Sequence, residues 1–300
     1  MMLRKLIFIG LLLPVLIFGQ QKKDTIKVFF LGGQSNMVGY GLNNQLPDSL
    51  QLTQTKVQIF NGNPSFDATK NKDIGIWAQL KPGFGDGFYS NGKTNLLSKK
   101  FGPELSFAKK LQELYTNEKI AIIKYARNGT SLDCLAARNF GCWHPDFKEI
   151  NQFNHFLTTI QNALAIKDID NDGKEDILIV SGIVWMQGES DAGITEAIAS
   201  NYYKNLKSLM NSIRKSFKNN ELPVVIGKIS DSGRNAEGKI YPYGELVQYG
   251  QEKFVKSDKN AAIVRNTRFY KFSDLWHYNS TGFIDLGIQF AEALYKLDKK

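Results

Sequence analysis

The 300-residue chain has few of the residues that build crosslinked folds. It contains two cysteines, which excludes a fold held by many disulfides, and a chain of this length can bury a core that is stable without them. Its Lys and Arg residues give a formal net charge of +9, but no run of five or more basic residues occurs. The excess charge predicts a solvated surface and no nucleic-acid-binding site.

Long apolar runs are also scarce, and the exception lies at the N-terminus. Arg4 and Lys5 precede an apolar run over 6–18, and a polar segment follows from Gln21. This run is shorter than the ~20 residues that span a membrane. The pattern predicts a signal peptide over residues 1–20 and a secreted or periplasmic protein with no stable membrane anchor after cleavage. An uncleaved anchor is the alternative.

The two cysteines, Cys134 and Cys142, stand eight residues apart in a loop-like segment. In an exported protein a local disulfide is expected between them, and two free thiols are the alternative. With His144 as the one histidine beside them, they are too few for a structural zinc site, which normally needs four protein ligands.

Over the rest of the chain, apolar strand-like runs alternate with amphipathic helical runs. Several of the strand-like runs are apolar throughout, as expected for strands buried on both faces. The predicted strands are 26–31, 56–60, 120–125, 177–185, 223–229 and 261–264, and the predicted helices are 103–115, 150–166, 195–217, 244–255 and 280–297. The alternation predicts one α/β domain over residues 21–300, a three-layer α/β/α sandwich around a central parallel sheet.

Residues 40–101 depart from this pattern. They are rich in Gly, Asn, Lys and Ser, and a mostly irregular stretch of this length inside a compact domain tends to be functional. Four aromatic residues of the stretch suit stacking on sugar rings: Trp77, Phe84, Phe88 and Tyr89. Packing of the same rings onto the sheet is the alternative.

A serine follows the first predicted strand, within the run GGQSNMVG at 32–39. Open α/β sheets bind their ligands at the carboxyl ends of the strands, and glycines let the backbone turn sharply there. Ser35 is therefore a candidate nucleophile. The Gly-x-Ser-x-Gly elbow of the α/β-hydrolases is absent, because Met37 stands where that elbow has its second glycine.

A candidate base and acid occur together near the C-terminus. Asp274 and His277 lie three residues apart, just before the last predicted helix. In a turn, this spacing lets the carboxylate accept a hydrogen bond from the imidazole, which fixes the tautomer and stabilises the imidazolium formed on proton uptake. A helix start with an unrelated surface histidine is the alternative.

Two more polar runs follow predicted strands, NGTS at 128–131 and WMQGESD at 185–191. Acyl transfer needs hydrogen-bond donors aimed at the developing oxyanion. The candidate donors are the backbone N–H groups of Ser35 and Gly129 and the side-chain amide of Gln187. Asn36 and Glu189 are expected to support the site, and Glu189 is also a second candidate for the triad acid.

An acidic run, DIDNDGKED at 168–176, has carboxylates at alternate positions and a glycine at the sharp turn. It matches the first nine positions of an EF-hand loop, but Ile179 stands where the bidentate glutamate is required. A weaker calcium loop is the interpretation, and a solvated acidic turn is the alternative. The candidate ligands are Asp168, Asp170, Asp172 and Asp176. Serine acyl transfer itself needs no metal or organic cofactor.

The four polar runs around Ser35, Gly129, Gln187 and His277 together resemble the SGNH hydrolases of the sialate O-acetylesterase and acetylxylan esterase branch, over residues ~25–297. The resemblance implies the flavodoxin-like fold of those hydrolases and a secreted serine esterase that removes O-acetyl groups from acetylxylan, sialic acid or other glycans. It implies a Ser35 nucleophile, an acid and base at Asp274 and His277, and oxyanion donors at Gly129 and Gln187. The chain departs from the family pattern at Asn128, where a glycine is common.

Two other functions stay open. A carbohydrate-binding protein of this fold would have little turnover, and the intact Ser35, Asp274 and His277 argue against it. A lipase or thioesterase would need a long apolar groove, and the polar stretch over 40–101 argues against it. Two basic residues are candidates for contact with a sugar carboxylate: Arg127 and Arg138.

Overall fold

The computed structural model of the protein describes residues 23–62, 75–234, 236 and 238–300. The predicted signal peptide over residues 1–20 lies outside this part of the chain. Within it, no helix combines the length and apolar character needed to cross a bilayer.

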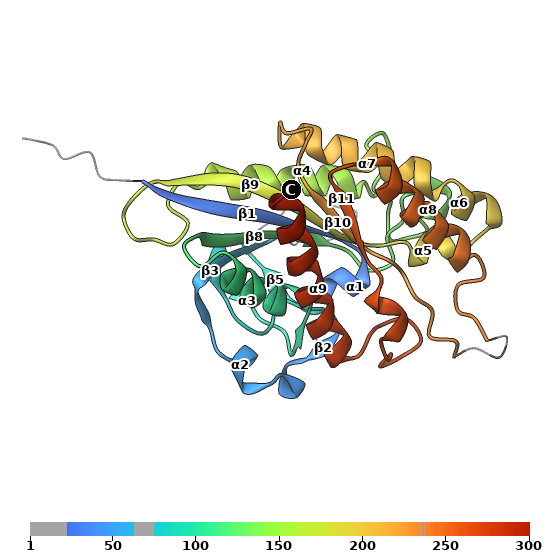
Figure 1. Cartoon of the computed structure of the whole chain (residues 1–300), viewed down its shortest axis with the longest axis horizontal. Coiled ribbons are helices and arrows are strands. Elements are labelled where there is room, and N and C mark those ends of the chain that lie inside the picture. Colours follow the sequence, from blue (N-terminus) through green and yellow to red (C-terminus); the bar gives the residue numbers. More distant parts are fainter. Residues whose placement is uncertain (1–22, 63–74, 235, 237) are drawn as a thin grey trace, which may run out of the picture.

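A seven-stranded sheet lies at the centre, in the order β11-β10-β9-β1-β8-β3-β4 (Figure 1). Its strands are β1 (Asp24–Gly33), β3 (Gln54–Asn61), β4 (Trp77–Leu80), β8 (Lys119–Ala126), β9 (Asp176–Met186), β10 (Val224–Gly227) and β11 (Ala261–Val264). All neighbouring strands pair in parallel except β4, which runs antiparallel to β3 at the edge. The predicted parallel sheet is confirmed, with one antiparallel edge strand that the sequence analysis missed.

Helices cover both faces of the sheet (Figure 1). One face holds α3 (Glu104–Leu114) and α9 (Ser280–Asp298), and the other holds α4 (Gln152–Ala165), α7 (Tyr202–Ser216) and α8 (Gly244–Ser257). Consecutive residues of β1 pack in opposite directions. The ring of Phe29 lies 5.8 Å from that of Phe107 on α3, and the ring of Phe30 lies 4.8 Å from that of Phe156 on α4. Because side chains alternate along a strand, β1 is buried on both faces, and its sequence is apolar for that reason.

The remaining elements are short. They are α1 (Ser35–Val38), β2 (Gly41–Leu42), η1 (Asn43–Gln45), α2 (Asp48–Gln51), β5 (Tyr89–Ser90), β6 (Asn95–Leu96), β7 (Lys100–Phe101), η2 (Cys134–Ala136), α5 (Glu189–Ala192), α6 (Glu196–Ser200) and η3 (Asn266–Phe269). The single helix predicted over 195–217 is divided into α6 and α7 at Asn201. After this turn the Tyr202 ring is buried, and its hydroxyl donates to the Gln187 carbonyl at 2.8 Å.

Three of the four aromatic residues predicted to stack on sugars pack against other parts of the protein. Trp77 donates its indole N–H to the Ala163 carbonyl of α4 at 2.9 Å. Phe84 and Phe88 are buried, with ring centroids 5.0 Å apart. Tyr89 is 40% exposed. The packing alternative therefore describes three of the four rings.

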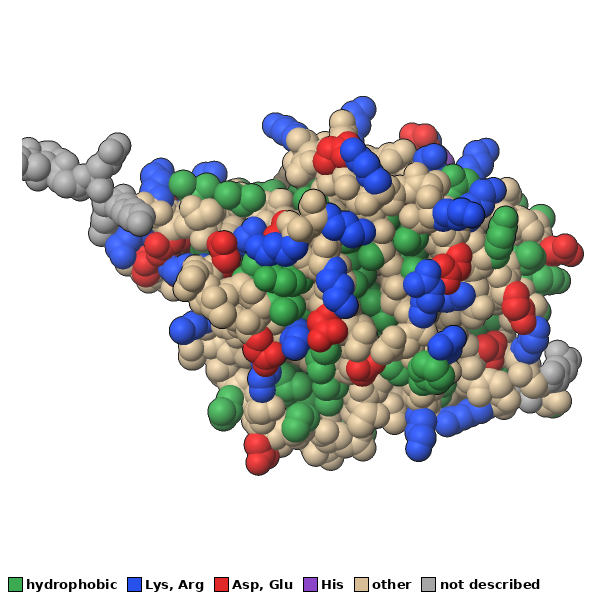
Figure 2. Space-filling model, in the orientation of Figure 1, with side chains coloured by type: hydrophobic (Ala, Val, Ile, Leu, Met, Phe, Trp, Pro, Cys, Tyr) green, Lys and Arg blue, Asp and Glu red, His purple; other side chains and the backbone are tan. Residues whose placement is uncertain are grey.

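Charged side chains of both signs are dispersed over the face shown in Figure 2. Ion pairs occur throughout the described residues, such as Arg265 with Glu252 at 2.6 Å and Lys100 with Asp86 at 2.9 Å. This face therefore presents a mixed and solvated charge distribution.

Candidate active site

The predicted serine lies at the carboxyl end of the central strand β1. Gly33 ends the strand with a φ of 144°, and the Gln34 N–H donates to the Met186 carbonyl of β9 at 2.9 Å. A Cβ at Gly33 would lie 2.0 Å from that same oxygen, so only glycine lets the two strand ends approach this closely. Ser35 then begins α1 with 6% of its surface exposed.

The predicted acid and base form one hydrogen-bonded turn. Asp274 Oδ2 lies 2.7 Å from His277 Nδ1, and Asp274 Oδ1 accepts the backbone N–H groups of Trp276 and His277 at 2.8 Å each. Burial alone would raise the pKa of Asp274, but these hydrogen bonds outweigh it and lower the pKa. The carboxylate is thus kept ionised, and Nε2 of the ring is left for another partner.

A tyrosine that the sequence analysis did not single out covers the imidazole. The Tyr40 ring stacks on His277 with centroids 3.6 Å apart and planes 4° apart. The Lys100 ammonium lies over the same tyrosine ring, 4.3 Å from its centroid. Since the imidazole fills one face, Lys100 must lie against the other. Burial and the neighbouring Asp86 carboxylate raise the pKa of Tyr40, so the phenol stays neutral.

Asn36 connects the serine helix to the histidine turn. It is 1% exposed, and its amide nitrogen donates to Glu189 Oε1 at 2.8 Å and to the Trp276 carbonyl at 3.1 Å. Its amide oxygen accepts the Tyr278 N–H at 3.2 Å. One side chain therefore joins segments that are more than 150 residues apart in sequence.

Behind the same helix, a buried ion pair holds the last residue of α1. The Lys124 ammonium donates to the Val38 carbonyl, the Phe84 carbonyl and Glu104 Oε2, at 2.8, 2.9 and 2.8 Å. Glu104 Oε1 accepts the Gly102 N–H at 2.9 Å. With every polar partner satisfied, this charge pair can persist in the core.

Glu189, the second candidate for the triad acid, is not bonded to the imidazole. It is 4% exposed and lines the same cavity as Ser35. Its Oε1 accepts from Asn36, and its Oε2 has no hydrogen-bond partner within the described residues. Burial raises the pKa of Glu189 to about 7, against the opposing hydrogen bond from Asn36. Among the described residues, Asp274 is the one carboxylate that hydrogen-bonds the His277 ring.

Two of the three predicted oxyanion donors, Ser35 and Gly129, belong to residues that line the cavity. Within the described residues, the backbone N–H groups of Ser35 and Gly129 have no acceptor. Gly129 has a φ of 69°, and a Cβ there would lie 2.6 Å from the Phe140 ring. A side chain at this position would therefore displace both the turn and the cavity wall.

Gln187 is placed differently from the prediction. It is fully buried and is not among the residues that line the cavity. Its amide nitrogen donates to Gln34 Oε1, the Thr130 carbonyl and Asp191 Oδ2, at 3.2, 3.1 and 2.7 Å. These N–H groups are therefore already hydrogen-bonded within the protein. In this structure Gln187 links three segments and does not line the cavity.

Asp191 is a residue that the sequence analysis did not assign. Its carboxylate accepts the backbone N–H groups of Leu132 and Asp133, at 3.1 and 2.8 Å. Burial raises the pKa of Asp191 to about 6, although the amide of Gln187 and these N–H groups oppose the rise. The contacts fix the loop that follows Gly129.

A cavity of about 520 Å³ opens beside Ser35 and His277. Its wall includes four aromatic side chains, Tyr40, Phe140, Tyr241 and Trp276. Arg138 is the one lysine or arginine among the described residues of this wall. Its guanidinium lies over the Phe140 ring at 5.1 Å and donates to Ser190 Oγ at 3.3 Å. Arg127, the other basic candidate, lines a smaller neighbouring hollow with Asp86.

The two cysteines lie in contact as free thiols, with their Sγ atoms 3.1 Å apart. Cys142 is buried, and burial raises the pKa of its thiol. The segment between Cys134 and Cys142 carries Arg138 and Phe140 of the cavity wall. The predicted disulfide is not formed in this structure and stays a prediction.

Comparison with known families identifies the family of the chain. A family model described as carbohydrate esterase, sialic acid-specific acetylesterase, matches residues 25–296. The chain belongs to this family. The resemblance drawn from the sequence motifs is thereby confirmed, and the protein is a carbohydrate esterase, a hydrolase that acts on esters. Comparison with curated protein sequences gives no match.

Solved structures share the fold of this carbohydrate esterase at low sequence identity. A protein from Arabidopsis thaliana has a TM-score of 0.63 at 17% identity, covering 92% of this chain and 99% of that one. NanS has a TM-score of 0.60 at 16% identity, covering 92% and 98%. XAC1771, a carbohydrate acetylesterase from Xanthomonas citri, has a TM-score of 0.60 at 16% identity, covering 91% and 57%.

Proposed function

We propose that this carbohydrate esterase is a secreted serine esterase that removes O-acetyl groups from glycans through an acetyl-serine intermediate. The observation that carries the proposal is that Ser35 and His277 line one cavity, while Asp274 already orients the imidazole at 2.7 Å. Export is inferred from the basic and apolar pattern over residues 1–20.

In the first half-reaction, His277 Nε2 takes the Ser35 proton while Oγ attacks the acetyl carbonyl carbon. The Ser35 and Gly129 N–H groups stabilise the oxyanion. The bond between the carbonyl carbon and the sugar oxygen then breaks, and His277 gives the proton to that oxygen, which leaves as a sugar hydroxyl. In the second half-reaction His277 takes a proton from water, whose oxygen attacks the acetyl carbon. The bond from that carbon to Ser35 Oγ breaks, His277 gives the proton to Oγ, and acetate leaves. The Ser35 hydroxyl has no partner within the described residues before substrate binds, and such catalytic hydrogen bonds often form only in the complex.

The cavity wall supports a carbohydrate substrate. Its aromatic rings, Tyr241 and Trp276 among them, suit the apolar faces of sugars. Arg138 offers one positive charge at the same wall, which fits an acetylated sugar that bears a carboxylate. We therefore propose acetylated sialic acid or another acidic acetylated sugar as the preferred substrate, with neutral acetylated glycans such as acetylxylan as the second candidate.

The decisive experiment measures acetate release from acetylated sialic acid and acetylxylan by wild type and by Ser35→Ala. We expect kcat to fall by roughly 10⁴–10⁶ in the variant, because the triad acts as a unit. Unchanged acetate release by the variant would refute the assignment of Ser35.

Two further assays separate the alternatives. A fluorophosphonate probe should label wild type at Ser35, whereas a protein that only binds carbohydrate would stay unlabelled. Hydrolysis of 4-nitrophenyl esters should fall as the acyl chain lengthens from acetate. A rise with chain length would favour the lipase alternative.

A further inference from the structure

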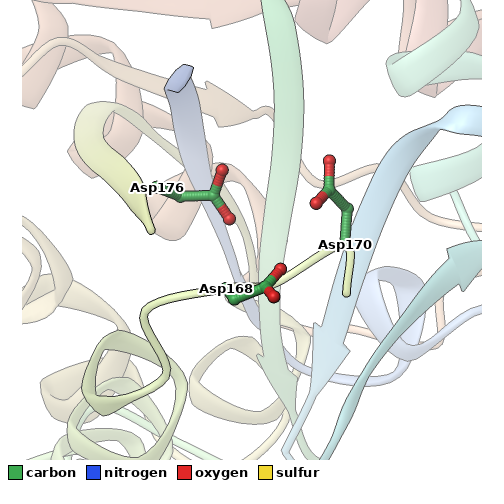
Figure 3. Close-up of side chains that lie close together, drawn as sticks. All are labelled: Asp168, Asp170 and Asp176. Atoms are coloured by element: carbon green, nitrogen blue, oxygen red, sulfur yellow. The ribbon is translucent and has the colours of Figure 1, made fainter. Parts of the chain in front are cut away.

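Three aspartates gather at the end of the sheet opposite the cavity (Figure 3). Asp168 and Asp170 belong to the turn between α4 and β9, and Asp176 is the first residue of β9. One carboxylate oxygen of each lies within 4.8 Å of the other two. Asp172, the fourth predicted ligand, is not part of this group, and its carboxylate accepts the Lys174 N–H at 2.9 Å.

Two of these carboxylates keep a buried oxygen without a partner. Asp176 is 7% exposed; its Oδ2 accepts the Ile169 N–H at 2.8 Å, and its Oδ1 has no hydrogen-bond partner within the described residues. Asp170 Oδ2 accepts from Lys119 at 2.9 Å, and its buried Oδ1 likewise has none. Figure 3 shows the carboxylates turned toward a common space. Buried polar atoms are nearly always paired, so these two oxygens require an explanation.

The charges around the cluster are unbalanced. Within the described residues, Lys119 is the one basic side chain that pairs with these three carboxylates, and it donates to Asp170 at 2.9 Å. The cluster therefore has an excess of negative charge in a poorly solvated place, which a bound cation would neutralise.

We propose that this turn binds one calcium ion through an oxygen each of Asp168, Asp170 and Asp176. Hard cations prefer oxygen ligands, and calcium accepts irregular geometry with carbonyl and water oxygens completing six to eight contacts. Magnesium demands near-ideal octahedral geometry, which three carboxylates from a turn and a strand start do not provide. The carboxylate of Asp168 also accepts the Asp172 and Gly173 N–H groups, at 3.1 and 2.9 Å, which orients it toward the other two.

The proposed ion would act on stability and not on catalysis. Asp176 lies in register with Asp24 at the start of β1, so the ion would hold the α4–β9 turn to the starting edge of the sheet. The cavity lies beyond the other end of β9, roughly 30 Å away along the strand. Calcium should therefore raise the melting temperature while leaving kcat unchanged. This inference stands independently of the proposed substrate.

The experiment uses the full mature chain after treatment with EDTA and dialysis. Calorimetric titration with CaCl₂ should show one site, with a Kd in the range of about 10⁻⁴–10⁻³ M that is typical of extracellular modules. At 10 mM CaCl₂ we expect the melting temperature to rise by roughly 2–5 °C over an NaCl control of equal ionic strength. Asp176→Asn and Asp170→Asn should abolish both effects, whereas Asp48→Asn, which removes an exposed carboxylate on α2, should retain them.

Each outcome decides the proposal. Asparagine keeps an oxygen that can accept the Ile169 N–H, so Asp176→Asn should still fold, and circular dichroism verifies this. Calcium binding by wild type and Asp48→Asn but not by the two cluster variants supports the site. Absence of both heat and a melting shift in wild type would overturn it. So would equal binding by Asp176→Asn and Asp170→Asn, or tighter binding of magnesium than of calcium.

Discussion

Glu189 makes the stability of this esterase depend on pH in a way that one substitution can isolate. The carboxyl is buried beside the cavity that Ser35 lines, and burial raises its pKa from 4.5 to about 7. In the unfolded chain the group ionises near its ordinary value, so between these two pH values the folded state holds a proton that the unfolded state has lost. Stability from this group is therefore present at acid pH and declines as the pH rises toward 7.

The size of the effect follows from the two pKa values. At about 1.4 kcal/mol per pH unit, the interval from 4.5 to about 7 corresponds to about 3 kcal/mol of unfolding free energy. Between pH 5 and pH 8 the loss amounts to about 2–3 kcal/mol. Glu189→Gln cannot ionise, and its side-chain oxygen can still accept the hydrogen bond from Asn36. The variant should thus gain about 2–3 kcal/mol relative to wild type over this range.

Urea unfolding of wild type and Glu189→Gln at pH 5, 6, 7 and 8 measures this difference directly. Titrating groups that do not interact with Glu189 are present in both proteins and cancel in the comparison. Asp191, which acts electrostatically on Glu189, does not cancel in this way. The denaturant slopes should match, since the same surface unfolds. Parallel stability curves for the two proteins across the four pH values would refute the argument.

Two further substitutions test how the catalytic groups are held. Tyr40→Leu removes the ring that stacks on His277, and such a stacked pair is worth about 0.5–1.5 kcal/mol. We therefore expect kcat to fall by about 2- to 13-fold. Tyr40→Phe keeps the ring and should retain activity, so an equal loss in both variants would contradict the stacking role. Lys124→Met leaves Glu104 as an uncompensated buried charge and should lower the unfolding free energy by about 3–5 kcal/mol. The double variant Lys124→Met/Glu104→Leu should recover part of this loss in the same urea experiment, and no recovery would contradict the account.

The fold could be predicted largely because burial on both faces leaves a visible mark in the sequence. β1, β8 and β9 lie in the middle of the sheet, and each contains four or more consecutive apolar residues that are buried on both faces. These runs are residues 28–31, 120–123 and 183–186. The missed strand β4 has four residues at the edge of the sheet, where a single buried face gives no continuous apolar run. The turn at Asn201 was missed because both flanking helices share one amphipathic pattern.

The candidate site was only partly predictable because many of its contacts cross long stretches of sequence. Asp274 and His277 are three residues apart, so their hydrogen bond could be anticipated from a turn. Tyr40 meets the imidazole from 237 positions away, and nothing near it in sequence indicates that contact. Gln187 was assigned to the oxyanion because it ends a strand, but the direction of a side chain at such a place is decided by its partners. Those partners are Gln34, Thr130 and Asp191.

Because the thiols of Cys134 and Cys142 are in contact, the compartment in which the chain folds decides whether they form a disulfide. Their contact distance means that an oxidising compartment could bridge them while the chain folds, whereas a reducing cytosol would leave them as thiols. Once folded, burial and the raised pKa of Cys142 disfavour the thiolate that any later exchange would need. The redox state that this pair reaches during folding should therefore persist in the folded protein.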